Sequence, residues 1–82
     1  MNSVLITGSN KGIGLELVKL YLGQGYPVIA CCRDPEGASD LQGLAKDNSG
    51  LRVEALDPGD PSSVVALKER LGDTPLDILL NN

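Results

Sequence analysis

The chain has 82 residues, of which 41% are hydrophobic and 22% charged, and its net charge is −4. This length suffices for one small domain of marginal stability. The acidic balance argues against a nucleic acid or an anionic membrane surface as a partner, and no apolar run approaches the length of a transmembrane helix. Because histidine is absent, His-based catalysis and His metal sites are excluded within these residues, and we expect no metal.

Apolar strands and helical segments alternate from the start of the chain. Residues 3–7 form a nearly continuous apolar run, which is typical of a parallel strand buried on both faces. Apolar residues at helical spacing predict a helix over residues 12–22, and the glycines that follow would end it. Pro27 then begins a second apolar strand over residues 28–32, at a position where a missing N–H donor is tolerated.

The second half continues this alternation. Residues 33–37 are predicted to form a loop and residues 38–46 a polar helix, whereas the alternating pattern of residues 51–56 indicates a half-exposed or edge strand. Asp60 and Pro61 predict the N-cap and first position of a helix ending at residue 71, and residues 76–80 form a fourth apolar strand. The alternation implies an open parallel sheet with right-handed crossovers.

The two cysteines, Cys31 and Cys32, are adjacent in an apolar strand. Neighbouring strand side chains point to opposite faces, so we expect no bond between them but two small buried thiols in a reducing compartment. Met1 leads into a strand without a basic region of the signal-peptide kind. We therefore expect a cytoplasmic protein.

Residues 7–14, Thr-Gly-Ser-Asn-Lys-Gly-Ile-Gly, link the first strand to the first helix. Such a turn points backbone N–H groups at a phosphate. Gly8 can take the tight turn, Gly12 lets a pyrophosphate approach the backbone, and Gly14 lets the helix pack closely on the strand. The glycine spacing is four then two, rather than the two then three of G-x-G-x-x-G, so a strand–helix turn without a ligand stays an alternative.

Three motifs together identify a family resemblance. Thr-Gly-x-x-x-Gly-Ile-Gly at residues 7–14, Asp57 after the third strand and Asn81-Asn82 after the fourth occur in order. They resemble the short-chain dehydrogenase/reductase family, with its Thr-Gly-x-x-x-Gly-x-Gly and later Asn-Asn-Ala-Gly patterns. The segment Ser-Asn-Lys-Gly-Ile-Gly-Leu-Glu-Leu is most similar to the carbonyl-reductase and C-factor (sniffer)-like branch of that family. The resemblance covers residues 1–82.

This resemblance implies an α/β fold, a Rossmann-like parallel sheet of order 3-2-1-4, and a set of cofactor-binding residues. Thr7 would hydrogen-bond across the turn. Asp57 would accept a hydrogen bond from an adenine amino group, or be a solvated turn residue. Asn81 would lie beside the adenosine ribose or buttress the sheet, unless Asn81-Asn82 is a frayed end. The pyrophosphate would be cradled by the turn residues Gly8, Ser9, Asn10, Lys11, Gly12, Ile13 and Gly14, with Ile13 supplying a backbone contact.

Charge favours NADP(H) as the cofactor. NAD-dependent enzymes place an acidic residue at the end of the second strand, on the ribose hydroxyls. Here that residue is Cys32, which is small and neutral, and Arg33 follows it. Arg33 could make a bidentate contact to a 2′-phosphate, and Lys11 reaches the same region in related NADP enzymes. Solvated surface charges are the alternative for both cations.

The family's catalytic motif is absent. No Tyr-x-x-x-Lys occurs, because Tyr21 is followed by Gly25 at the fourth position and Tyr26 by Ala30. We therefore assign no catalytic residue. We expect residues 1–82 to be the N-terminal part of a single NADP-binding domain that is incomplete, as in a splice product, a truncated gene model or an excerpt. Two helices would then cover one sheet face, a third the other, and the fourth strand would be an exposed apolar edge.

Two functional hypotheses follow. The first is the cofactor-binding half of an oxidoreductase that uses NADPH to reduce a small carbonyl substrate in a full-length form, which could be a homo-oligomer; the 82 residues alone would be inactive. The second is a non-catalytic nucleotide-binding or interaction module that pairs through its exposed edge. A methyltransferase or flavin site would leave Asp57 and Asn81-Asn82 unexplained.

Overall fold

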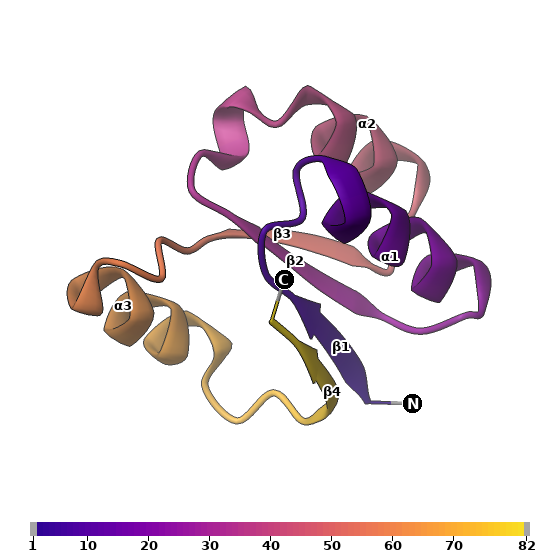
Figure 1. Cartoon of the computed structure of the whole chain (residues 1–82). Coiled ribbons are helices and arrows are strands. Elements are labelled where there is room, and N and C mark those ends of the chain that lie inside the picture. The colour runs from indigo at the N-terminus through magenta and orange to yellow at the C-terminus, as the bar shows by residue number, and fades with distance from the viewer. Residues whose placement is uncertain (1, 82) are drawn as a thin grey trace.

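A computed structural model of the chain describes residues 2–81 and shows a parallel sheet between two layers of helices (Figure 1). The four strands pair in the order β3-β2-β1-β4, and every pair is parallel. This confirms the predicted Rossmann-like α/β fold. In chain order the elements are β1 (Ser3–Ile6), α1 (Gly12–Gly23), β2 (Val28–Cys32), the 3₁₀ turn η1 (Pro35–Gly37), α2 (Ser39–Asp47), β3 (Leu51–Ala55), α3 (Pro61–Leu71) and β4 (Leu76–Leu80).

The start of α3 shows how local chemistry fixes an element. The Asp60 carboxylate accepts a hydrogen bond from the Ser62 N–H at 3.0 Å, and Pro61 occupies the first helical position, as predicted. The Ser62 hydroxyl also donates to this carboxylate, at 2.7 Å, and this bond together with the one from the N–H holds the pKa of Asp60 below its usual value. Gly72, at φ 57°, follows the last helical residue in a conformation that glycine adopts without strain.

Element ends differ slightly from the prediction, and one short element is new. The predicted first and third strands extended one residue further, but β1 ends at Ile6 and β3 at Ala55. The segment 33–37, expected as a plain loop, contains η1, where the Gly37 N–H donates to the Asp34 carbonyl at 3.2 Å. Pro35 suits the first position of this turn because no donor is needed there.

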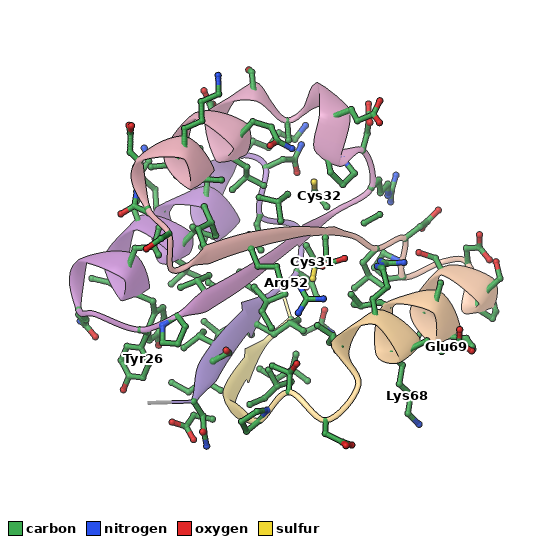
Figure 2. The ribbon with its side chains drawn as sticks, turned by 180° about the vertical axis from the view of Figure 1, so that it is seen from behind. Tyr26, Cys31, Cys32, Arg52, Lys68 and Glu69 are labelled. Atoms are coloured by element: carbon green, nitrogen blue, oxygen red, sulfur yellow. The ribbon has the colours of Figure 1, made fainter. Side chains whose placement is uncertain are left out.

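The two faces of the sheet are covered unequally. In Figure 1, α1 and α2 lie on one side of the sheet and α3 lies on the other, as predicted. Cys32 belongs to the core under α1 and α2, whereas Cys31 belongs to the core under α3. Figure 2 shows the two cysteines on opposite sides of the sheet, and both thiols are free. The predicted alternation along β2 is thereby confirmed.

The two edges of the sheet also differ in chemistry. β3 lies at the edge beside α3, where Glu54 pairs with Arg52 and with Arg70, the latter at 2.7 Å. β4 lies at the opposite edge, with Leu76 40% and Leu79 64% exposed. The predicted exposed apolar edge is therefore present in β4.

Candidate functional site

The turn between β1 and α1 is held from inside the fold. Gly8 and Gly12 have positive φ angles of 58° and 60°, which side-chain-bearing residues rarely adopt. Ser9 is fully buried; its N–H donates to the Cys31 carbonyl at 3.0 Å and its hydroxyl donates to the Ile6 carbonyl. The polar groups of Ser9 thus shape the turn, and its predicted contact with a cofactor stays a prediction.

The N-terminus of α1 offers donors to a ligand. Lys11, the N-cap residue, has an extended backbone and its side chain makes no capping hydrogen bond. The first helical N–H recorded with a carbonyl acceptor is that of Leu15, bonded to the Lys11 carbonyl at 3.4 Å. The N–H groups of Gly12, Ile13 and Gly14 precede it and have no helical acceptor, as at any α-helix start. With the helix dipole, these N–H groups form a binding site for an anion.

The space beside the turn is open. A Cβ atom placed on Gly12 would meet no other atom within 4 Å. A cleft of about 730 Å³ lies there, at the carboxyl ends of β1, β2 and β3, where ligands bind in open α/β sheets. Its lining comes from the turn (Gly8, Asn10, Lys11, Gly12, Ile13), from the segment after β2 (Cys32, Arg33, Asp34, Gly37) and from the segment after β3 (Leu56, Pro58).

A second hollow of about 530 Å³ runs along α1. Ile13, Leu17 and Leu20 supply much of its apolar lining, and Glu16 is the one charged residue there. It lacks a cation and is therefore poorly suited to a phosphorylated ligand. Both predicted cations, Lys11 and Arg33, line the larger cleft instead.

The larger cleft contains both predicted cations and also carboxylates. Arg33 is exposed at its mouth, and Cys32, at the end of β2, is only 3% exposed. Asp34 also lines the cleft, and Asp57 lies beside it with its Oδ1 3.9 Å from the Arg33 Nε. Sequence reasoning missed Asp34, although it directly follows Arg33 along the chain. The region of the cleft therefore contains two cations and two carboxylates.

Asp57 is anchored at the start of a turn. Its Oδ1 accepts a hydrogen bond from the Gly59 N–H at 3.0 Å, and its own N–H donates to the Ser63 hydroxyl at 2.9 Å. These contacts are those of the turn aspartate that was the alternative interpretation. Oδ2 accepts no hydrogen bond within residues 2–81, so the same side chain could still accept one from a ligand.

Asn81 buttresses the sheet. The Thr7 hydroxyl donates to the Asn81 Oδ1 at 3.1 Å and to the Leu80 carbonyl at 3.4 Å. These two bonds join the end of β1 to the end of β4. The expected bond of Thr7 across the glycine turn stays a prediction. Asn81 is not among the residues lining the cleft, and Asn82 lies outside the described residues.

Other kinds of site find little support in the part of the chain that the structure describes. No group of three or more His, Cys, Asp or Glu side chains is placed to hold a metal ion there, and none of its helices is both long and apolar enough to cross a membrane. Burial raises the pKa of Cys32, and burial together with nearby Glu54 raises that of Cys31 to about 12. Both thiols are therefore poor nucleophiles at neutral pH.

Comparison with known protein families establishes the family of this chain. The sequence pattern of the short chain dehydrogenases matches residues 2–82. The chain belongs to this family. Among curated relatives, an uncharacterized oxidoreductase of Schizosaccharomyces pombe is 42% identical over 85 residues, covering 99% of this chain, and retinol dehydrogenase 5 of Mus musculus is 42% identical over 84 residues, covering 96%.

Solved structures show the same short-chain dehydrogenase fold. A carbonyl reductase from Pseudomonas aeruginosa PAO1 in complex with NADP superposes on the whole chain with a TM-score of 0.93 at 35% identity. The carbonyl reductase Sniffer of Drosophila melanogaster does so with a TM-score of 0.81 at 36% identity. The chain spans 38% and 36% of these two structures, and 26% of each curated relative named above. The predicted carbonyl-reductase resemblance is confirmed, and it covers the N-terminal part of these proteins.

Proposed function

We propose that the chain is the NADP(H)-binding part of a short-chain oxidoreductase that, in a longer form, reduces small carbonyl compounds. One observation carries this proposal: the cleft at the strand ends brings Lys11 and Arg33 together with the free N–H groups of α1, beside a neutral Cys32. The N–H groups suit a pyrophosphate, and the two cations suit a 2′-phosphate. The NADP-bound carbonyl reductase of Pseudomonas aeruginosa PAO1 supports the choice of cofactor.

The fit of a dinucleotide can be judged from the backbone. Gly12 has open space where a side chain would stand, so a pyrophosphate could approach the N–H groups that precede Leu15. The cleft volume of about 730 Å³ lies within the usual range for cofactor pockets. The contacts we propose are those of the turn residues Gly8 to Gly14, Arg33, Asp57 and Asn81, the last acting through its bond to Thr7.

Selection of the 2′-phosphate would come from the segment after β2. Cys32 carries no charge at neutral pH, because burial raises its pKa. Arg33, with 81% of its side chain exposed, can turn its planar guanidinium toward a phosphate. An acidic residue at position 32 would instead hydrogen-bond the ribose hydroxyls of NAD and repel the phosphate.

The bound nicotinamide would supply the hydride, and these residues would bind and orient it. We assign no catalytic residue within residues 1–82 and expect no turnover from this chain alone. The carbonyl reductases among its structural relatives support a small carbonyl substrate for the longer form. A cytoplasmic location, and a homo-oligomer for that form, are part of the same proposal.

A fluorescence titration of the 82-residue chain with NADPH, and with NADH for comparison, tests the proposal. Saturable binding that favours NADPH is expected. Arg33→Ala should weaken NADPH binding by about tenfold, the worth of one charge-assisted contact, and leave NADH binding unchanged. Lys11→Ala should also weaken NADPH binding, whereas Lys68→Ala, which removes an exposed cation of α3, should not (Figure 2). Equal affinity for both nucleotides would contradict the proposed cofactor.

The exposed edge of β4 favours the second candidate, an interaction module. Leu76 and Leu79 are exposed beside a strand edge with unpaired backbone groups. Sedimentation velocity of the purified chain, with and without NADPH, separates the two candidates. A chain that self-associates through β4 and binds neither nucleotide would favour the module.

A further inference from the structure

Arg33 and Asp57 meet although they follow different strands. β2 and β3 pair in parallel register, with Cys32 opposite Ala55, so the segments after both strands leave the same end of the sheet. The Arg33 Nε and the Asp57 Oδ1 end 3.9 Å apart, beside the cleft that holds the proposed cofactor. An ion pair therefore involves the guanidinium that we assign to the 2′-phosphate.

The two members of this pair differ in how they are anchored. Asp57 is half-buried, and hydrogen bonds to Gly59 and Ser63 fix its carboxylate and its backbone. Arg33 has 81% of its side chain exposed, and Asp57 is its one ion-pair partner within residues 2–81. The exposed guanidinium therefore lies beside a carboxylate that is anchored by other bonds.

We propose that Asp57 is a specificity-determining residue that weakens the preference for 2′-phosphorylated nucleotides by competing with the 2′-phosphate for Arg33. This inference rests on the proposed NADP(H) site and goes beyond the adenine contact that the family resemblance implies for Asp57. The ligand class concerned is adenine nucleotides that differ only at the ribose 2′ position.

Two electrostatic effects act in the same direction. The guanidinium must be shared between Asp57 and the phosphate, and the carboxylate also repels the phosphate itself. Asp34, the other carboxylate at this cleft, adds to the repulsion, so Lys11 and Arg33 do not present an excess of positive charge. Because the pair is solvent-exposed, the effect should be modest and should shrink with added salt.

The test uses the ratio of the NADH to the NADPH dissociation constant. Any contact between Asp57 and adenine is common to both nucleotides and cancels in this ratio. Asp57→Asn should raise the ratio by about twofold to fivefold at low salt, the range of an exposed ion pair, and by less in 0.5 M salt. In an Arg33→Ala background the same substitution should change the ratio less.

Asp73→Asn provides the matched control, because it removes one exposed carboxylate in the turn before β4, near the opposite end of the sheet. Its ratio should equal that of the wild type. Circular dichroism confirms that each variant is folded, and Asp57→Glu, which keeps the charge, gives a second measure should the Asn variant unfold; its ratio should stay close to that of the wild type.

The outcomes separate the two proposals. If Arg33→Ala leaves the ratio unchanged, the proposed cofactor preference fails and the Asp57 inference fails with it. If Arg33→Ala lowers the ratio but Asp57→Asn leaves it unchanged or lowers it, only the Asp57 inference is wrong. A rise in the ratio in both Asp57→Asn and Asp73→Asn would reflect net charge and would also overturn the inference.

Discussion

The two faces of the sheet bury very different amounts of apolar surface. Within residues 2–81, ten buried residues form the core under α1 and α2, and four form the core under α3. Alternate residues of β1 take part in each, with Val4 and Ile6 on the first face and Leu5 on the second. The hydrophobic core on the face under α1 and α2 is thus larger than the core under α3.

The difference shows how the candidate site is supported. The glycine turn lies where β1 meets α1, on the well-packed face, and its geometry is fixed by bonds to β1 and β2. The α3 face leaves apolar residues uncovered, including Leu79 of β4 at 64% exposure. Buried area sets most of the folding free energy, so we expect the first face to dominate stability.

Two leucine-to-alanine substitutions, one in each core, test this asymmetry and should give the largest changes in unfolding free energy. Leu41 of α2 is fully buried in the larger core, and Leu67 of α3 is 6% exposed in the smaller one. Leu41→Ala should cost about 3–5 kcal/mol of unfolding free energy, and Leu67→Ala about 2–3 kcal/mol, because the thinner face can collapse around the cavity. Urea unfolding measures both, and a larger loss in Leu67→Ala would reverse the comparison.

On the α3 side, an ion-pair cluster of Glu54, Arg52 and Arg70 joins α3 to β3. Burial would raise the pKa of Glu54, but hydrogen bonds from Arg70 and Arg52 outweigh this and hold it below its ordinary value of 4.5. Arg70 and Arg52 also donate to the carbonyls of Ala55 and Arg70, so the cluster ties α3 to β3. Glu54→Gln should destabilise the chain at pH 7 by about 1–3 kcal/mol.

The sign of the pH dependence follows from the lowered pKa of Glu54. Its contribution is complete above the ordinary value of 4.5 and is lost as the pH falls through the folded-state pKa. Glu54→Gln should therefore flatten the acid side of the stability profile. Glu69→Gln is the control, because Glu69 points away from the sheet and forms no recorded ion pair in the described chain (Figure 2); an equal loss there would show that the cluster is unimportant.

The buried thiol of Cys31, on the α3 face, should make stability depend on pH under alkaline conditions. Its pKa is raised to about 12 from an ordinary 9.0, so the folded chain keeps the proton that the unfolded chain loses. The resulting stability is complete below pH 9.0, falls as the pH rises, and is gone above about 12. Between pH 8 and 10 the wild type should lose about 1 kcal/mol more than Cys31→Ala, measured by thermal unfolding. Parallel profiles would mean that the α3 face admits the thiolate.

The smallest expected effect on stability comes from the uncovered part of that face. Leu79→Ser should change the unfolding free energy by less than about 0.5 kcal/mol, because the side chain is already 64% exposed. The substitution should nevertheless reduce self-association at high protein concentration, since it removes an apolar residue from an open strand edge. Sedimentation velocity measures the self-association. If the variant associates as strongly as the wild type, the associating surface lies elsewhere on the chain.

Local patterns in the sequence were enough to predict the elements. Asp60 and Pro61 placed the start of α3, and the alternation of strands and helices gave a parallel sheet. Gly8, which was predicted to take the tight turn after β1, has a positive φ angle, and so has Gly12. These features depend on few neighbouring residues, so a single sequence contains them.

The contacts between distant segments were not predictable in the same way. No local rule showed that Thr7 would bond to Asn81, that Arg33 would rest beside Asp57, or that Glu54 would hold α3 through Arg70. The η1 turn is also joined to α2 by a bond from the Gln42 side chain to the Pro35 carbonyl at 2.8 Å. Each of these contacts requires the register of two elements to be known first.

The sequence by itself determined the family, the strand–turn–helix motif and the residue types available to bind a phosphate, because these are properties of short segments and their order. Only the tertiary structure decided which charges face one another at the cleft, and how unequally the two faces are covered. Ion pairs and buried area depend on distances between chain segments, and parallel pairing of β2 with β3 is what brings Arg33 to Asp57.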